Sequence, residues 1–345
     1  MVKIKKILIT VFIVITLLLT GCGKANDKEI RNKFIKEAEN LKGYHLEGDL
    51  TLTNNDDTYN YNVDVSFSKD DLFKVKLVNK NNEYEQTILR NNDGVYVITP
   101  SLNKSFKFQS EWPYNNSQSY LLQSVAKDLK EDKDYKFVKK DKNYIFTTKV
   151  NYPNNPNYIK QNITLDKNYN LSKVKVMDAN DIPYIIFKVT EIDKKAIYDK
   201  NQFSLELEKD KLIEDPKEEE TNKEITPTTD VLNEALFPLY LPNNTALSNK
   251  EVIDTTNGKR VIMTFEGDNP FILVQENAIK EKELTVIPTY GEPYQLIDTV
   301  GSLTDISYTW ASNGIEYYIV SDVMGQKELL EVAKSINSVA TLNEK

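Results

Sequence analysis

The sequence predicts an α+β fold in which an antiparallel sheet covered by helices is followed by a smaller C-terminal α+β domain. Two observations lead to this prediction. Short runs of alternating apolar and polar residues recur along both halves of the chain, separated by turns rich in Asn, Asp and Lys. Such alternation is typical of antiparallel strands with one buried face and one wet face. Apolar residues recur at helical spacing in only three segments, so we expect a few helices that cover sheets.

The first predicted element is a helix over residues 28–42. Asp27 is a suitable N-cap for it, and Gly43 is a suitable stop. Its apolar positions are Ile30, Phe34, Ala38 and Leu41. Because strand after strand follows, we expect this apolar face to lie on a sheet.

The strands that follow alternate in hydrophobicity, and the first domain closes near residue 207. Asp93-Gly94 has the composition of a tight hairpin turn. Helical spacing interrupts the alternation over residues 117–130, which predicts a second helix. The predicted strands are 44–52, 59–67, 72–78, 84–90, 95–98, 105–108, 135–138, 144–150, 158–165, 171–178 and 182–192. These elements define a predicted domain over residues 28–208.

Residues 209–230 are predicted to be an acidic flexible linker. The segment is highly charged, contains two prolines and has almost no apolar residues, so it cannot repay the entropy of ordering. An interaction tail is the alternative, but the position between two strand-rich regions favours a linker. A smaller α+β domain is predicted over residues 231–340. Its predicted strands are 261–265, 271–275, 283–287, 306–310 and 315–320, followed by a helix over 326–337. Asn257-Gly258 supports a hairpin that leads into the first of these strands.

The N-terminus has the organisation of an export signal. Three lysines precede an apolar run over residues 7–19, and small residues then lead to Cys22. An uncleaved membrane anchor is the alternative, but the apolar run is shorter than the ~20 residues that span a bilayer. The sequence Leu19-Thr20-Gly21-Cys22 resembles a bacterial lipobox. This resemblance implies a signal peptide over residues 1–21, cleavage before Cys22, and a diacylglyceryl anchor with acyl chains such as palmitate on that cysteine.

Composition excludes several functional classes. The formal net charge is −8, and it becomes more negative once the signal lysines are removed, so nucleic acid is a poor partner. Electrostatic attachment to anionic lipid is also disfavoured, which leaves the lipid anchor to hold the protein at a membrane. Cys22 is the one cysteine of the chain, so its acylation leaves no thiol for a disulfide, a nucleophile or a zinc site.

No set of catalytic residues is evident. The one histidine, His45, lies in an alternating segment and is interpreted as a half-exposed strand residue, and no Gly-x-Ser-x-Gly elbow accompanies it. The conventional zinc ligand set is also missing. Adjacent carboxylates occur at Asp56-Asp57, Asp70-Asp71 and 218–220, all in predicted turns or the linker, where solvated charges are expected. The run 54–57 lacks the spacing of an EF-hand. We therefore expect no enzyme activity, no cofactor and no metal.

Three stretches of the first domain resemble LolA-type lipoprotein carriers. Residues 87–100 (TILRNNDGVYVITP) resemble the strand, Asp-Gly turn, strand and proline signature of that family. Residues 171–178 (LSKVKVMD) with 185–189 (IIFKV) resemble its late hairpin, and 198–203 (YDKNQF) its closing segment. The resemblance covers roughly residues 28–208. It implies that the first sheet is an antiparallel half-barrel covered by helices.

The second domain extends this resemblance. Its residues Tyr240-Leu241-Pro242, Trp310 with Gly314, and 333–336 (AKSI) resemble a domain of unknown function found in Gram-positive lipoproteins. The two domains together resemble lipoproteins of the GerS and YdcC type in spore-forming bacteria. That resemblance implies a sporulation or germination factor, located at the outer face of the cytoplasmic or spore-envelope membrane. It also implies a protein partner, the amidase that modifies cortex peptidoglycan.

Two departures limit what the resemblance implies. LolA carriers are soluble shuttles, whereas this chain is expected to be permanently tethered. Short GerS-type proteins lack a linker and a second domain of this kind, so the subgroup within the type stays open.

Binding is the function class that remains. A LolA-like half-barrel under a helix would enclose an apolar cavity suited to acyl chains. The candidate residues for its lining or lid are Tyr96, Trp112, Tyr120, Leu121 and Leu122, and the same residues would serve equally well as a packed core. Three functions follow: support of a cortex amidase, transport or binding of lipid or acylated protein, and an extracytoplasmic sensor or regulator.

Overall fold

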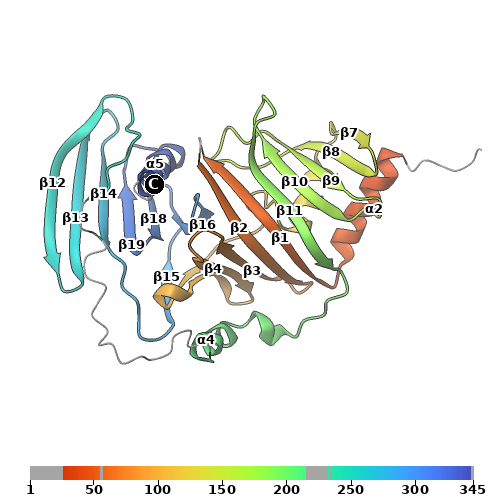
Figure 1. Cartoon of the computed structure of the whole chain (residues 1–345), viewed down its shortest axis with the longest axis horizontal. Helices are drawn as coiled ribbons and strands as arrows, with labels where there is room; N and C mark the ends of the chain where they lie inside the picture. The colour runs from red at the N-terminus through yellow and green to blue at the C-terminus, as the bar shows by residue number, and fades with distance from the viewer. Residues whose placement is uncertain (1–25, 55–56, 215–231, 233–234, 343–345) are drawn as a thin grey trace, which may run out of the picture.

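The computed structural model describes residues 26–54, 57–214, 232 and 235–342. It contains two sheets side by side; several described helices pack on the first sheet and one packs on the second (Figure 1). The α+β class with a large antiparallel sheet, covering helices and a smaller second sheet is therefore confirmed. The predicted signal peptide, Cys22, Asp56 and the acidic run 218–220 lie outside the described residues.

The first sheet has twelve strands in the order β15-β6-β5-β4-β3-β2-β1-β11-β10-β9-β8-β7. Neighbours are antiparallel except for the pair β15 and β6. The first six strands are β1 (Gly43–Asn54), β2 (Asp57–Ser68), β3 (Leu72–Asn79), β4 (Glu85–Asn91), β5 (Gly94–Thr99) and β6 (Lys104–Phe108). The others are β7 (Lys136–Lys140), β8 (Asn143–Lys149), β9 (Lys160–Leu165), β10 (Leu171–Met177), β11 (Pro183–Asp193) and β15 (Thr285–Thr289).

Helix α2 (Asp27–Asn40) begins one residue earlier than predicted, because its N-cap is Asn26 and not Asp27. The Asn26 side chain accepts a hydrogen bond from the Glu29 amide at 2.8 Å, and the Glu29 carboxylate accepts one from the Asn26 amide at 3.2 Å. This reciprocal pair is a capping box. The apolar face of α2 packs into the core beside α3 (Leu122–Glu131). We call the face of the first sheet that carries α2 and α3 the inner face.

Helix α3 begins five residues later than the predicted start at 117. The preceding segment is held elsewhere: the Ser117 amide donates to the Asn151 carbonyl at 2.8 Å, and the Gln118 amide donates to the Ser124 hydroxyl at 2.7 Å. These bonds replace the intrahelical bonds that a longer helix would make.

The outer face of the first sheet carries a short helical cover. A 3₁₀ turn, η2 (Lys200–Phe203), places Phe203 in a small apolar cluster on that face, and α4 (Leu205–Glu214) follows it. Residues 209–214, predicted as the start of the linker, are therefore helical. Glu208 pairs with Lys74 of β3 at 3.3 Å, which attaches α4 to the sheet.

The second sheet has the order β12-β13-β14-β19-β18-β17-β16, and α5 (Gln326–Leu342) packs on one of its faces. Its strands are β12 (Thr245–Thr255), β13 (Gly258–Gly267), β14 (Phe271–Asn277), β16 (Glu292–Gln295), β17 (Val300–Leu303), β18 (Ser307–Ser312) and β19 (Ile315–Val320). Strands β16 and β17 were not predicted, and β12 was implied only as the partner of 261–265 in a hairpin that turns at Asn257-Gly258. Every residue of β12 except Thr245 is exposed. The strand therefore lacks the alternation of buried and exposed residues by which a strand is recognised in a sequence.

Strand β15 connects the two halves of the molecule. It was predicted within the second domain, but it pairs with β6 in parallel, with Thr285 opposite Lys104 and Thr289 opposite Phe108. It covers the backbone edge that β6 would otherwise leave open. A single apolar core, which includes Val97 of the first sheet and Val300 of the second, extends across both units.

Asp128 generates a pH-dependent prediction. Burial raises the pKa of its carboxyl to about 6, and hydrogen bonds from Ser117 and Gln161 offset part of the rise. The pKa of this carboxyl is higher in the folded chain than in the unfolded chain. Its contribution to the free energy of unfolding is therefore most favourable below about pH 4, where it is protonated in both states, and it is lost as pH rises through 6. Asp128→Asn removes this loss. We expect the free energy of unfolding of this variant to exceed that of the unsubstituted chain by an amount that grows from about 1 kcal/mol at pH 4.5 to about 3 kcal/mol at pH 7.5.

Urea unfolding at the two pH values measures this difference. The matched control is Asp134→Asn, since the Asp134 side chain is 85% exposed. A stability difference between Asp128→Asn and the unsubstituted chain that is the same at both pH values would contradict the assigned role.

Candidate functional site

The inner face of the first sheet is occupied by a hairpin tip of the second unit. Residues 296–299 join β16 to β17, and the Leu296 amide donates to the Thr299 carbonyl at 2.8 Å to close the turn. Leu296 and Ile297 are buried in the same core as Leu50 and Ile88 of the first sheet. The space that an open half-barrel would offer to a ligand is thus largely filled by the chain itself.

Gln86 of β4 fixes this hairpin to the sheet. Its side-chain oxygen accepts a hydrogen bond from the Val300 amide at 2.6 Å, and its side-chain nitrogen donates to the Val300 carbonyl at 3.1 Å. The Thr299 hydroxyl donates to the same oxygen at 3.3 Å, and the nitrogen also donates to the Thr99 hydroxyl at 3.2 Å. Gln86 is 5% exposed, so these bonds satisfy a buried amide that would otherwise be costly.

Tyr61 of β2 provides a second attachment. Its hydroxyl donates to the Ile297 carbonyl at 2.6 Å. Burial raises the pKa of Tyr61 well above its usual value, so the hydroxyl keeps its proton and remains a donor. Two side chains of the first sheet therefore hold backbone groups of one hairpin tip.

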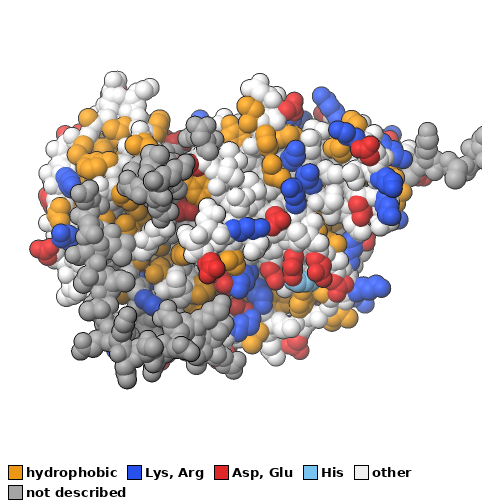
Figure 2. Space-filling model, in the orientation of Figure 1, with side chains coloured by type: hydrophobic (Ala, Val, Ile, Leu, Met, Phe, Trp, Pro, Cys, Tyr) orange, Lys and Arg blue, Asp and Glu red, His pale blue; other side chains and the backbone are white. Residues whose placement is uncertain are grey.

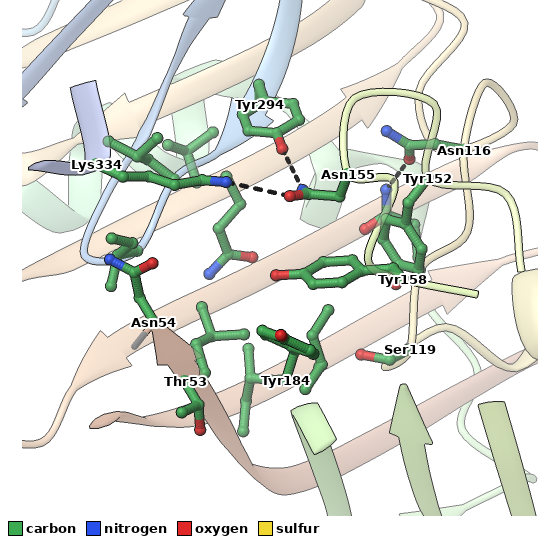
Figure 3. A pocket seen from close by; sticks show the side chains of 18 of the residues that line it. Thr53, Asn54, Asn116, Ser119, Tyr152, Asn155, Tyr158, Tyr184, Tyr294 and Lys334 are labelled. Atoms are coloured by element: carbon green, nitrogen blue, oxygen red, sulfur yellow. Dashed lines mark hydrogen bonds between the residues drawn. The ribbon is translucent and has the colours of Figure 1, made fainter. Parts of the chain in front are cut away.

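A cavity of about 170 Å³ remains beside the tip (Figure 3). Asn155 lies between the two units there: its amide nitrogen donates to the Tyr294 hydroxyl at 2.6 Å, and its oxygen accepts from Lys334 of α5 at 3.1 Å. Other tyrosines that line the cavity are Tyr120, Tyr152, Tyr158 and Tyr184. The volume is below the ~300–1,000 Å³ that is typical of small-molecule sites.

The chemistry of this cavity is that of neutral hydroxyls and amides. Burial raises the pKa of Tyr152, Tyr158 and Tyr294 above their usual value, so none of them is a phenolate at neutral pH. Lys334 pairs with Glu331 at 3.0 Å. The cavity offers hydrogen-bonding groups and aromatic faces to a ligand. Among the described residues that line it, no general base lies beside a nucleophile.

A second cavity of about 420 Å³ lies where β5, β6 and β15 meet β17 and β18. Its apolar lining includes Val97, Phe106, Phe108, Ile287, Val300 and Trp310. An ion pair between the buried Lys104 and the half-buried Glu316 lies at its wall and joins the two units. This volume is within the range of ligand sites.

The structure separates the five residues that the sequence grouped as cavity lining. Trp112 and Tyr120 line the smaller cavity, whereas Leu121 and Leu122 are buried in the main core. Tyr96 lies on the outer face, in the cluster with Phe203. The alternation of β5 explains this, because Val95 and Val97 face the inner core and the residue between them must point away.

The sequence did not single out Gln86, Tyr61 or the hairpin tip. Gln86 shares the phase of buried Ile88 in β4, so a polar residue at a buried position was the available signal. The backbone groups that form hydrogen bonds with the Gln86 amide lie more than 200 positions away in the chain. No local sequence pattern encodes such a contact.

The remaining candidates lie on the outer face or in turns. The His45 side chain is 28% exposed, as expected of a half-exposed strand residue, and its Nε2 lies 3.2 Å from Asp64. Asp70 and Asp71 pair with different cations, Lys200 at 2.8 Å and Arg90 at 2.6 Å, so they do not act together. Among the described residues, no helix is long and apolar enough to cross a membrane.

Comparison with known proteins places the chain in a family. No family model matches it. It is 34% identical to sporulation protein YdcC of Bacillus subtilis (strain 168) over 341 residues, which are 97% of this chain and 98% of that protein. The chain belongs to the YdcC family of sporulation proteins.

Three solved structures are similar at low sequence identity. One is the Pseudomonas aeruginosa MucA/MucB complex (13% identity, 89% of this chain and 96% of that chain, TM-score 0.32). Another is the CwlD amidase from Clostridioides difficile in complex with the GerS lipoprotein (16%, 51% and 98%, TM-score 0.29). The third is the LolA superfamily protein NE2245 from Nitrosomonas europaea (11%, 51% and 98%, TM-score 0.30).

The contact between Gln86 and Val300 is directly testable. Gln86→Ala leaves the buried Val300 amide and carbonyl without their side-chain partner, and we expect a loss of about 2–4 kcal/mol in the free energy of unfolding. The hairpin tip loses one of its two attachments, so amide hydrogen exchange over residues 296–300 should rise in the native state.

Denaturant unfolding and exchange mass spectrometry measure the two effects. Gln326→Ala is the matched control, because the hydrogen bonds that the Gln326 side chain makes among the described residues lie within the second unit, to Thr304 and Asp305. Unchanged exchange over 296–300 in the Gln86 variant would show that the tip is held without this contact.

Proposed function

We propose that this chain is a membrane-tethered, non-enzymatic lipoprotein that binds another protein during sporulation. The observation that carries the proposal is the relationship to a sporulation protein over 97% of the chain. The partner implied by the sequence resemblance is a cortex peptidoglycan amidase. The lipobox at Leu19-Thr20-Gly21-Cys22 supports attachment to the outer face of the cytoplasmic or spore-envelope membrane.

The interior of the first unit supports a role other than catalysis. Its inner face is filled by the hairpin tip, and the tyrosines around the remaining cavity are protonated. His45, the one histidine of the chain, lies on the other side of the sheet. A general base and a nucleophile are therefore not brought together by the described residues.

An outward surface of the second sheet fits a protein partner. Antiparallel register places Ile262 of β13, Val274 of β14 and Tyr318 of β19 in one row, on the face opposite the buried residues Met263 and Leu273. We call this row, together with Ile272 and Val320 in the adjacent row, the apolar row surface. Ile272 and Tyr318 are 39% and 40% exposed, so two large apolar side chains on neighbouring strands are partly in contact with solvent.

The edge of the same sheet is also available for pairing. Strand β12 is at the end of the strand order, and Val252 and Ile253 on it are exposed. An exposed edge beside an apolar face suits recognition by strand addition or by a docked sheet.

A binding experiment with the cognate cortex amidase tests the proposal. The mature chain should bind the purified amidase or change its activity. Tyr318→Asp puts a charge on the apolar row surface, and we expect it to weaken binding by at least about tenfold.

Tyr290→Asp is the matched control, since Tyr290 is 90% exposed and lies after β15, away from the row. A chain that neither binds the amidase nor affects it would sink the amidase proposal. Equal weakening by both variants would sink only the assignment of the surface.

The 420 Å³ cavity favours one alternative, in which the protein holds an acyl chain of a lipid or an acylated protein. Ala311 is at its wall, so Ala311→Phe should fill part of the space. Native mass spectrometry of the purified protein should then detect an acyl species on the unsubstituted chain and lose it in the variant. No co-purifying acyl species, together with no uptake from added fatty acid, would exclude this alternative.

A further inference from the structure

The outer face of the first sheet carries a compact group of metal-binding side chains. Residues paired across antiparallel strands point to the same side of a sheet, so register defines the group. Glu47 of β1 is opposite Asp64 of β2 and Glu191 of β11. His45, two positions before Glu47, is opposite Asp193 of β11. The sheet thus gathers one imidazole and four carboxylates on one patch.

The geometry of three of these residues matches a metal site. Nε2 of His45 lies 3.2 Å from Oδ1 of Asp64 and 3.8 Å from Oε1 of Glu47. One ligand atom from each of the three lies within 4.8 Å of the others. Zinc bonds to nitrogen and oxygen are about 2.0–2.2 Å long, so ligand atoms at the corners of a tetrahedron lie about 3.3–3.5 Å apart. The side chains therefore need only small rotations to share one ion.

In the strand register, Lys76 of β3 lies directly opposite Asp64, so a cation does neighbour the patch. The lysines of the adjacent strand β3 have other partners: Lys74 pairs with Glu208 at 3.3 Å, and Lys76 pairs with Glu85 at 2.7 Å. Figure 2 shows acidic side chains gathered around His45. In the described part of the chain, no lysine or arginine forms an ion pair with Glu47 or Asp64. A bound cation would relieve the repulsion among these carboxylates.

The scaffold beneath the patch is rigid. Strands β1 and β2 are twelve residues each and are paired from Gly43 opposite Ser68 to Asn54 opposite Asp57. Strand β11 pairs with the other side of β1. The backbone positions of ligands on paired central strands are fixed more firmly than those of ligands on loops, which favours metal binding because only the side chains have to be ordered.

We propose that His45, Glu47 and Asp64 bind a divalent transition-metal ion of the zinc type. An imidazole with two carboxylates is a ligand set for zinc, whereas magnesium and calcium prefer oxygen ligands alone. Water or a carboxylate of β11 completes the coordination. The site lies on the opposite face from the hairpin tip and does not depend on the proposed protein partner. It replaces the sequence-based expectation that the chain has no metal site.

The sequence makes the test unusually direct, since His45 is the one histidine of the chain. The mature chain from residue 22, with Cys22→Ser and no histidine tag, gives one set of imidazole NMR signals. Zinc chloride added at about pH 7.5 should shift the Nε2 resonance and give one-to-one binding by calorimetry, whereas magnesium chloride should do neither.

Three variants make the assignment specific. His45→Ala and Asp64→Asn should each weaken zinc binding by at least about tenfold, without a change in the circular dichroism spectrum. Asp254→Asn, an exposed aspartate of β12, is the matched control and should bind as the unsubstituted chain does. No imidazole shift in excess zinc, or binding that is unaffected by His45→Ala, would overturn the proposal and leave these residues as an ion pair.

Discussion

The bidentate contact between the Gln86 amide and the Val300 backbone determines how the molecule is organised. A buried amide with both of its ends satisfied is stable only while its partner stays in place. Because that partner is a hairpin of the second unit, the two units cannot separate without exposing a polar group on an apolar sheet face and leaving Val300 unpaired. Strand β15, which extends the first sheet, and the part-buried ion pair of Lys104 with Glu316 reinforce the same constraint.

This constraint decides which surfaces are available for function. An open half-barrel would offer its inner face to a ligand, but here Leu296 and Ile297 pack against it and leave about 170 Å³. Space for an apolar ligand is found instead between the units, in the cavity beside Trp310. Recognition of a macromolecule therefore falls to outward surfaces. The apolar row surface of the second sheet is the candidate proposed above, although exposed apolar side chains such as Val138 and Ile182 also occur on the first unit.

Local sequence patterns predicted what depends on local periodicity. Strand β2 has an apolar residue at every second position from Tyr59 to Phe67, and its buried phase follows directly. Strand β12 lacks a buried phase, so the same rule could not detect it. To predict the face on which Tyr96 lies, the register of the sheet would have to be known. To predict the partner of Gln86, the fold of a distant segment would have to be known. His45 was interpreted correctly as a strand residue, but its neighbour Asp64 comes from another strand.

The position of the proposed tether relates these surfaces to a membrane. Cys22 precedes the N-cap Asn26 by four residues, and a chain of that length spans at most about 14 Å. Helix α2 would then be held close to the bilayer if Cys22 is acylated. Figure 1 shows α2 at one end of the molecule and β12 at the other. Because the two units are joined by the Gln86 contact and by β15, the second sheet would be held away from the bilayer as part of one body. A tether at this end therefore favours docking of a partner on the distal sheet, and it disfavours a carrier that must leave the membrane to deliver its cargo.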